Sequence, residues 1–248
     1  MRRGNTAVNQ GRLMKVYNWL NYARRVLFPP VCRLCLAPCT GTLPLCPPCR
    51  DELPWLGVTC NRCALPLPLN YDQHTCPACL AHPPSLDSCR ALFSYQPPLD
   101  DWIHALKFGR DLAVAHLLGQ LLVEHLPSPE AGTRVLAVPL HPRRLRQRGY
   151  NQATQIARPL IQRGWLPDGC GCYRARHTPA QSALPATDRR GNLRGAFGVR
   201  KQLEGENILL IDDVMTTGTT LNEVATVLKD AGAGRVDARV IARALRPA

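Results

Sequence analysis

The sequence of 248 residues contains no uninterrupted run of the roughly 18 apolar residues that a membrane-spanning helix needs. Its N-terminal region also lacks the apolar core and the small-residue cleavage site of a secretory signal peptide. These absences argue against a membrane span and against secretion, so we expect a cytoplasmic protein. With 45% hydrophobic and 20% charged residues, the composition is that of a globular chain, long enough for one large domain or two small ones.

Acidic residues are scarce in residues 134–201, where only Asp168 and Asp188 face fourteen Arg or Lys. Fourteen positive and two negative charges leave +12, out of a formal net charge of +13 for the whole chain. A solvated surface usually mixes both signs, and solubility alone does not need clustered charge. The clustering therefore favours phosphate-rich partners, either small molecules or nucleic acid.

Twelve cysteines are present, and eight of them form four Cys-x-x-Cys pairs. Two cysteines separated by two residues direct both sulfurs to one ion, and two such pairs supply the tetrahedral thiolate set that zinc favours. In a reducing cytoplasm the pattern predicts metal binding and not disulfides. The predicted ligands are Cys32, Cys35, Cys46 and Cys49 for a first zinc ribbon and Cys60, Cys63, Cys76 and Cys79 for a second.

The other cysteines are Cys39, Cys89, Cys170 and Cys172, and we expect them to be small buried apolar residues. Two alternatives to the predicted ligand sets stay open. Cys39 could replace a ligand of the first site, and His74 lies beside the second. His74 would be redundant, because four cysteines already complete a tetrahedral set.

The chain changes character twice along its length. Residues 1–28 carry apolar side chains at helical spacing with Arg and Lys between them, which predicts an amphipathic helix packed on its own protein. Residues 29–88 are rich in proline and cysteine, and too poor in apolar runs to form a core without metal. Residues 89–248 alternate short apolar runs with helical stretches, which predicts an α/β domain with a parallel sheet flanked by helices.

The run ILLIDDVMTTGTT, residues 208–220, joins a buried strand to two carboxylates and a Thr-Gly loop. The loop lies at the carboxyl end of a parallel strand, where open α/β sheets bind ligands. Gly218 permits a tight turn, and the N-terminus of the following helix and the threonine hydroxyls favour a phosphate. The carboxylates of Asp212 and Asp213 suit hydroxyl groups nearby, and a sugar phosphate offers both kinds of group.

Two other phosphate-binding loops do not fit this run. No lysine follows the glycine, as a Walker A loop requires, and a single glycine is too few for a dinucleotide fingerprint. A simple helix cap would need one threonine and neither carboxylate.

Several segments of the chain resemble one known family. ILLIDDVMTTGTT is similar to the phosphoribosyl-pyrophosphate signature of type I phosphoribosyltransferases. The segments LKFGRD (106–111), VPLHPRRLRQRGYNQA (138–153) and RHTPAQSALPATDRRGNLRGAF (176–197) narrow the resemblance. Together with the double ribbon, they are similar over about residues 28–245 to the ComF family of competence-associated proteins.

The resemblance implies a type I phosphoribosyltransferase fold that binds phosphoribosyl pyrophosphate with Mg²⁺. It assigns the ribose hydroxyls to Asp212 and Asp213 and the pyrophosphate to residues 139–144, and residues 176–192 are similar to a loop that closes over the site. The loop implied to bind the 5-phosphate consists of Met215, Thr216, Thr217, Gly218, Thr219 and Thr220.

Breaking the anomeric bond leaves positive charge on the sugar and negative charge on the pyrophosphate, so Mg²⁺ and arginines would stabilise the leaving group. A closed loop would exclude water. The candidate catalytic residues are Asp212, Asp213, Arg176 and Arg189. The other cations expected at the pyrophosphate are Arg143, Arg144, Arg148 and, on weaker grounds, Lys107.

The resemblance also implies a role in DNA uptake or in the use of external DNA, with single-stranded DNA and DNA-uptake proteins as further partners. Two alternatives stay open: an active transferase on an unknown small acceptor without a DNA role, and a non-catalytic module that binds single-stranded DNA or protein. Glutamine-dependent amidotransfer is not expected, because that reaction uses an N-terminal cysteine and the first cysteine here, Cys32, lies in a predicted zinc knuckle.

Overall fold

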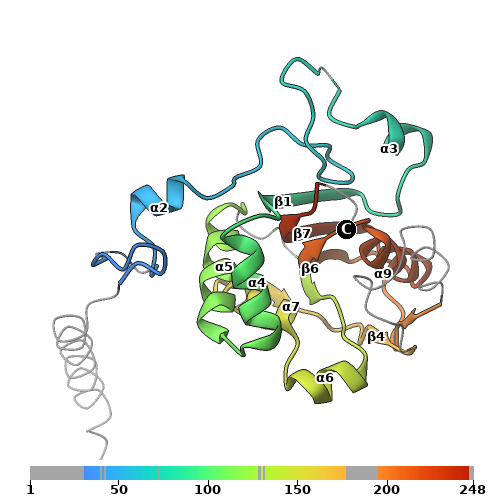
Figure 1. The fold of residues 1–248 in the computed structure, drawn as a ribbon. Helices are drawn as coiled ribbons and strands as arrows, with labels where there is room; N and C mark the ends of the chain where they lie inside the picture. Colours follow the sequence, from blue (N-terminus) through green and yellow to red (C-terminus); the bar gives the residue numbers. More distant parts are fainter. Residues whose placement is uncertain are drawn as a thin grey trace, which may run out of the picture. The chain divides into compact units, whose positions relative to one another are not determined.

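The computed structural model divides the chain into two compact units, Met1–Leu53 and Pro54–Ala248. The residues that it describes are 31–39, 41, 43–71, 73–127, 130, 132–176 and 195–245 (Figure 1). The helix predicted over residues 1–28 lies outside this described part. The domain boundaries predicted after residues 28 and 88 stay predictions. The four cysteines of the first predicted ribbon belong to the smaller unit, and those of the second belong to the larger one.

The described part of the smaller unit is a pair of cysteine loops with one short helix, α2 (Pro47–Asp51). Val31 and Pro38 form an antiparallel bridge, and the N–H of Cys32 donates to the carbonyl of Ala37 at 2.7 Å. Helix α2 begins directly after Cys46, with prolines in its first turn, where the missing N–H costs no hydrogen bond. These turns bring the two halves of the first ribbon together.

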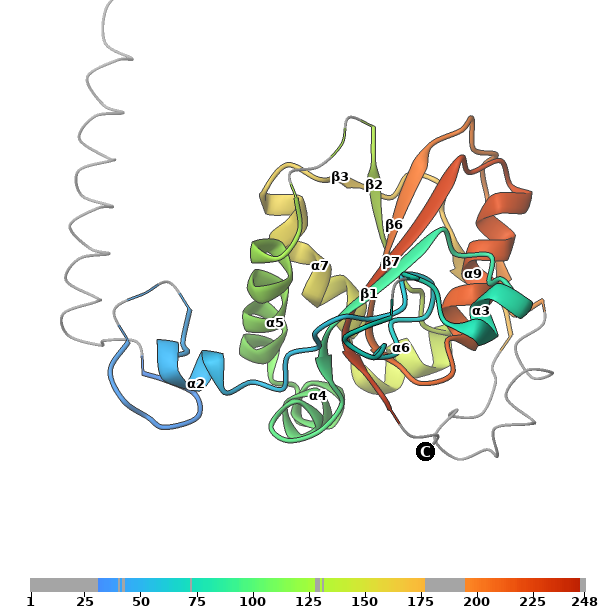
Figure 2. The same cartoon turned by 90° about the horizontal axis from the view of Figure 1, so that it is seen from above.

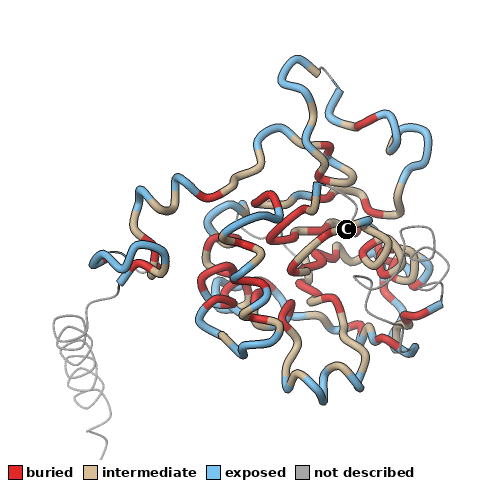
Figure 3. The backbone as a smooth tube through the Cα atoms, in the orientation of Figure 1, coloured by how far each residue is buried: buried red, intermediate tan, exposed pale blue. Residues whose placement is uncertain are grey.

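A parallel sheet of five strands forms the centre of the larger unit, in the order β1-β7-β6-β2-β3. Buried residues follow β6 and β7 along most of their length, as expected for central strands with both faces covered (Figure 3). The strands of this sheet are β1 (Ser88–Ser94), β2 (Arg134–Ala137), β3 (Leu166–Pro167), β6 (Asn207–Met215) and β7 (Arg235–Arg243). The predicted parallel sheet is confirmed.

Helices cover both faces of this sheet, as the sequence predicts. Figure 2 shows α5 (Leu112–Glu124) and α7 (Gln152–Gln162) on one face and α9 (Thr219–Asp230) on the other. Helices α5 and α7 approach closely because α5 carries a glycine at the crossing: a Cβ on Gly119 would lie 2.4 Å from the carbonyl oxygen of Ile156. Among the described residues, no helix has the length and apolarity needed to cross a membrane.

The long helical stretch after β1 consists of two helices, α4 (Leu99–Phe108) and α5. The chain turns between them at Gly109 and Arg110, which has a φ of 56°, and the side chain of Asp111 caps α5 by accepting from the N–H of Val114 at 3.3 Å. The break leaves Lys107 and Phe108 at the end of α4, beside the carboxyl ends of β2 and β6.

A second break divides the segment that contains RGYNQ. Helix α6 (Pro142–Arg148) ends at Gly149, whose φ of 87° suits a residue without a Cβ. Helix α7 then begins after Asn151, whose Oδ1 accepts from the N–H of Ala153 at 3.1 Å. A separate antiparallel pair consists of β4 (Tyr173–Arg174) and β5 (Phe197–Gly198). In the sequence, these two strands flank the undescribed residues 177–194.

The second cysteine loop, with helix α3 (Pro77–Ala81), is part of the larger unit and is bonded to the sheet region. The N–H of Cys89 in β1 donates to the carbonyl of Asn61 at 2.7 Å, and the guanidinium of Arg62 donates to the carbonyl of Leu86 at 2.6 Å. This loop is therefore joined to the sheet by hydrogen bonds between residues far apart in the sequence.

Candidate functional site

A cavity of about 590 Å³ lies at the carboxyl ends of β2 and β6. This is the edge at which open parallel sheets bind ligands, because the loops that follow the strands meet there. Of the residues predicted for the site, the cavity is lined by Lys107, Arg144, Arg148, Asp212, Asp213, Thr216 and Thr220. The fold thus brings together residues from α4, α6, β6 and α9.

Asp212 and Asp213 lie near the end of β6 and differ in their electrostatic surroundings. The ammonium of Lys107 lies 2.7 Å from Oδ2 of Asp213, and the N–H of Asp213 donates to Oδ1 of Asp212 at 2.9 Å. Burial and the neighbouring Asp213 raise the pKa of Asp212 well above its usual value. Burial opposes ionisation of Asp213 as well, but Lys107 outweighs it and lowers the pKa of Asp213.

The Thr-Gly loop has the geometry that its sequence predicts. Gly218 has a φ of 80° at the N-terminus of α9, and a Cβ there would lie 2.4 Å from Cε of Met215. The hydroxyl oxygens of Thr217 and Thr219 lie 2.8 Å apart. The free N–H groups of the first turn of a helix favour a phosphate at this end. Met215 is 5% exposed and packs in the core, so its side chain contacts the loop from the core side.

The predicted arginines do not all meet in the cavity. Arg144 and Arg148 lie one turn apart on α6 and line it, and burial and the positive charge of Arg148 lower the pKa of Arg144. A bound anion would relieve this repulsion. Arg143 is exposed and is not among the lining residues, and Arg176 is exposed beside the undescribed segment. Arg189 lies outside the described residues.

Sequence reasoning missed several residues of the cavity. The most buried arginine that lines the cavity is Arg174 on β4, which is 7% exposed and lies with its guanidinium carbon 5.3 Å from the ring centre of Phe197. A two-residue strand carries no periodicity, so nothing in the sequence distinguished Arg174 from the other arginines of residues 134–201, the basic segment. Lining residues that were also not predicted include Tyr95, Phe108, Arg110, Asn151 and Gln152.

The RGYNQ segment, whose role beyond Arg148 was not assigned from the sequence, supports the cavity from one side. The hydroxyl of Tyr150 donates to the carbonyl of Leu106, which anchors the last turn of α4 beside Lys107. The side-chain N–H of Asn151 donates to the carbonyl of Val138 at 2.9 Å, just after β2. These two hydrogen bonds join α4, β2 and α7 around the site.

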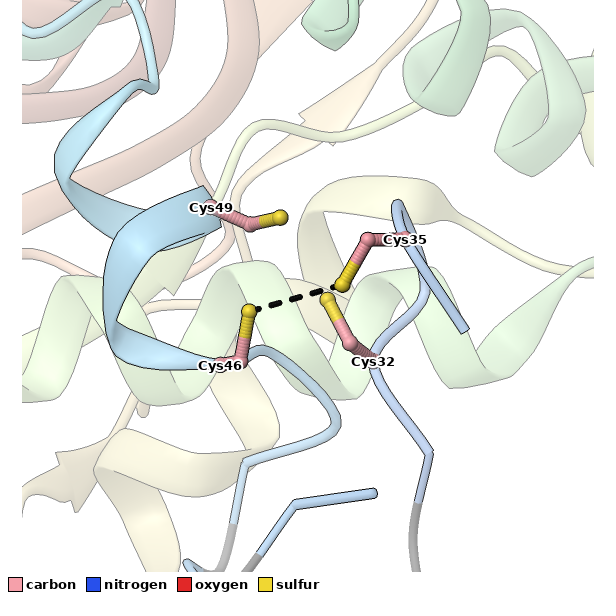
Figure 4. Close-up of side chains that lie close together, drawn as sticks. All are labelled: Cys32, Cys35, Cys46 and Cys49. Atoms are coloured by element: carbon pink, nitrogen blue, oxygen red, sulfur yellow. Dashed lines mark hydrogen bonds between the residues drawn. The ribbon is translucent and has the colours of Figure 1, made fainter. Parts of the chain in front are cut away.

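The first ribbon brings four thiols together in the smaller unit. The sulfurs of Cys32, Cys35, Cys46 and Cys49 lie within 4.8 Å of one another, with Cys35 and Cys46 at 3.6 Å (Figure 4). Four sulfurs at this spacing fit one tetrahedral zinc ion. Cys39 is buried but is not a member of this group.

The second ribbon has a matching group of thiols: Cys60, Cys63, Cys76 and Cys79. Sγ of Cys60 accepts from the N–H groups of Arg62 and Cys76, at 3.4 and 3.3 Å. Burial opposes ionisation of this thiol, but these donors lower its pKa to about 7. Such donors favour the thiolate that a metal ion needs. His74 does not join the group, and its carbonyl instead accepts from the N–H of Asn61 at 2.8 Å.

This fold and site define a phosphoribosyltransferase-like domain that is combined with two four-cysteine sites of the zinc-ribbon kind. The family models agree: the double zinc ribbon domain matches residues 23–80, and the phosphoribosyl transferase domain matches residues 175–247.

Named relatives extend the match over most of the chain. The DNA utilization protein YhgH of Escherichia coli K12 is 33% identical over 227 residues, which cover 88% of this chain and 98% of that protein. Competence protein F of Haemophilus influenzae is 32% identical over 213 residues, with 81% and 90% coverage. The chain belongs to the ComF family.

The two thiol groups predict the metal content. We expect the purified protein to bind two zinc ions, measured by elemental mass spectrometry against protein concentration. Replacement of Cys76 and Cys79 by Ser should leave one ion, because two thiolates cannot complete the second set. Cys39→Ser is the control and should retain both ions. A single ion in the wild type, or loss of an ion in Cys39→Ser, would contradict the assignment.

The raised pKa of Asp212 predicts that this residue destabilises the ligand-free fold at neutral pH. The folded state retains its proton above the unfolded pKa of roughly 4. The stability contributed by Asp212 is therefore present at low pH and is lost as the pH rises through the folded value. Asp212→Asn keeps an oxygen that can accept from the N–H of Asp213, so at pH 7 the variant should be more stable than the wild type.

Urea unfolding of the ligand-free protein at pH values between 5 and 8 measures this difference. The gain in stability of Asp212→Asn over the wild type should grow as the pH rises over this range. A gain that shrinks with rising pH would contradict the assignment of the retained proton to Asp212.

Proposed function

We propose that this chain binds phosphoribosyl pyrophosphate together with Mg²⁺ in the cavity at the carboxyl ends of β2 and β6, and that it acts in DNA uptake or in the use of external DNA. The observation that carries the proposal is the meeting of two carboxylates, a Thr-Gly loop and two arginines in one cavity. The eight paired thiols need a reducing compartment, which supports a cytoplasmic location.

The distribution of charge in the cavity suits this ligand. The N-terminus of α9 and the hydroxyls of Thr216 and Thr220 favour the 5-phosphate, and the carboxylates next to them suit the ribose hydroxyls. Arg144 and Arg148 lie on α6, the helix that follows β2, and suit the pyrophosphate. The cavity thus offers hydrogen-bond donors or positive charge to both phosphate groups, and carboxylate acceptors to the ribose hydroxyls.

Asp212 and Asp213 are the residues suited to hold Mg²⁺, which takes one or two carboxylates together with substrate oxygens and water. When bound, the ion would neutralise negative charge on the leaving pyrophosphate. The ion pair with Lys107 holds the carboxylate of Asp213 in place at 2.7 Å, so its orientation does not depend on the ligand. Asp212 would release its proton when Mg²⁺ binds beside it, because a nearby positive charge favours the carboxylate.

A DNA role is supported by different observations. The names of the relatives refer to DNA utilization and competence. The basic segment supplies the electrostatic attraction that nucleic acid needs, and it presents exposed arginines on two helices, namely Arg143 and Arg146 on α6 and Arg158 on α7. Phosphate contacts of this kind bind DNA without regard to sequence, which suits a protein that handles external DNA.

Calorimetric titration with phosphoribosyl pyrophosphate and Mg²⁺ tests the binding proposal. The wild type should bind, and Asp212→Asn combined with Asp213→Asn should weaken binding by roughly 100-fold or more, because two charge-assisted hydrogen bonds to the ribose are lost. Asp101→Asn should bind as the wild type does. No binding to the wild type, or equal binding to the double variant, would refute the proposal.

Fluorescence anisotropy with a labelled 20-nucleotide oligothymidine tests the DNA role. Affinity should fall steeply as salt rises from 50 to 200 mM, and replacing Arg143 and Arg146 by Ala should reduce the slope of log K against log salt by about 1.4, at roughly 0.7 per phosphate contact. Arg90→Ala, exposed on β1 outside the basic segment, is the control. Affinity weaker than micromolar and insensitive to salt would exclude DNA binding by this surface.

A further inference from the structure

Arg243, the last residue of β7, is a buried cation whose hydrogen bonds go to the backbone. It is 5% exposed, and its guanidinium donates to four carbonyl groups. Nε donates to the carbonyl of Cys63 at 2.9 Å, and the two N–H groups of Nη1 are shared among the carbonyls of Met215 at 3.0 Å, Ala244 at 2.7 Å and Thr216. Hydrogen bonds from a charged donor offset the cost of burying it.

Two of these acceptors belong to parts of the molecule that have different chemistry. Cys63 is a member of the thiol group of the second ribbon, so a bound metal would hold its backbone in place. Met215 and Thr216 begin the Thr-Gly loop, and Thr216 lines the cavity. One guanidinium therefore connects the metal site to the first two residues of the phosphate loop.

The orientation of the Met215 and Thr216 carbonyls fixes the orientation of the backbone N–H groups that follow them in the loop. In a trans peptide the C=O and the next N–H point in opposite directions. Because the carbonyls of Met215 and Thr216 face Arg243, the N–H groups of Thr216 and Thr217 point away from it. Successive N–H groups oriented in this way form the concave surfaces that bind anions.

Further contacts join the second ribbon and the chain that follows it to the other side of the loop. The N–H of Ser85 donates to Oδ1 of Asn222 at 2.7 Å, and its hydroxyl lies 2.7 Å from Oγ1 of Thr226, both on α9. The N–H of Asn222 in turn donates to the carbonyl of Gly218 at 2.9 Å. Beneath the loop, Sγ of Cys89 lies 3.5 Å from Sδ of Met215.

We propose that Arg243 is a positioning residue through which the metal-bound second ribbon holds the Thr-Gly loop in its anion-binding conformation. The part of the inference that concerns ligand affinity rests on the proposed function. The part that concerns the conformation of the loop does not. The planar guanidinium is essential here, because it donates in several fixed directions at once, whereas a lysine ammonium is a point charge on a flexible stem.

Hydrogen exchange of the ligand-free protein tests the inference without any activity. In Arg243→Lys, the amides of Thr219 and Asn222, which donate to Oγ1 of Thr217 and to the carbonyl of Gly218 in the loop, should exchange roughly 10-fold faster or more than in the wild type, because charged hydrogen bonds that hold the loop are lost. The amides of residues 208–211 in β6 serve as an internal reference and should be unchanged. Arg239→Lys is the matched control, since Arg239 lies on the same strand but donates to Ser88 and Ala238, away from the loop.

The link to the metal is tested by combining variants. Cys79→Ser, which removes a ligand of the second ribbon, should accelerate exchange in the same loop, and adding it to Arg243→Lys should have little further effect, because both changes break one connection. Additive effects of the two substitutions would overturn the link. If Cys79→Ser does not fold, the result for Arg243→Lys against Arg239→Lys still decides whether Arg243 positions the loop.

Titration of phosphoribosyl pyrophosphate with Mg²⁺ into the same proteins separates the two proposals. Affinity for Arg243→Lys should fall by roughly 10-fold or more, with Arg239→Lys unchanged. If the wild type fails to bind while loop exchange responds to Arg243→Lys, the proposed function fails and the positioning role stands. If binding and loop exchange in Arg243→Lys both equal those of the wild type, the positioning role is refuted and the proposed function stands.

Discussion

The parallel pairing of β6 with β2 on one side and with β7 on the other is the constraint on which the site depends. Parallel strands end at the same edge of a sheet, so the residues that follow them meet without any long excursion of the chain. Asp212 and Asp213, at the end of β6, therefore lie in the same cavity as Arg144, which follows β2, and Arg243 at the end of β7 lies behind it. An antiparallel partner in either place would have sent one of these groups to the opposite edge.

The cavity combines charges that oppose one another in the ligand-free protein. Two carboxylates lie side by side, and only Asp213 has Lys107 at ion-pair distance among the contacts described. Across the cavity, Arg144 and Arg148 repel each other. Such a site is costly to build because every buried charge has lost water, and the cost is offset when a ligand of mixed charge enters. Proteins accept this kind of local instability where they bind and react.

The two cysteine loops share a spacing of ligands but differ in what surrounds them. The first belongs to the smaller compact unit, and its four thiols bring together a short stretch of chain. The second is bonded to β1 through Asn61, to β7 through Cys63 and, through Ser85 just beyond it, to α9. A metal ion there would stabilise more than its own loop. The carbonyl of the ligand Cys63 accepts a hydrogen bond from Arg243, which also donates to the first residues of the Thr-Gly loop.

Both thiol groups, the parallel sheet, the Thr-Gly loop and the two aspartates were determined by the sequence itself. Each depends on local spacing: two residues between cysteines, a short apolar run before two carboxylates, and a glycine where the backbone needs a positive φ. Only the tertiary structure decided that Arg174 lines the cavity, that Arg143 does not, and that Arg243 joins the second ribbon to the loop. These three arginines cannot be told apart in the sequence. Their roles depend on which strands, distant in the sequence, the fold brings next to them, and no local pattern encodes that.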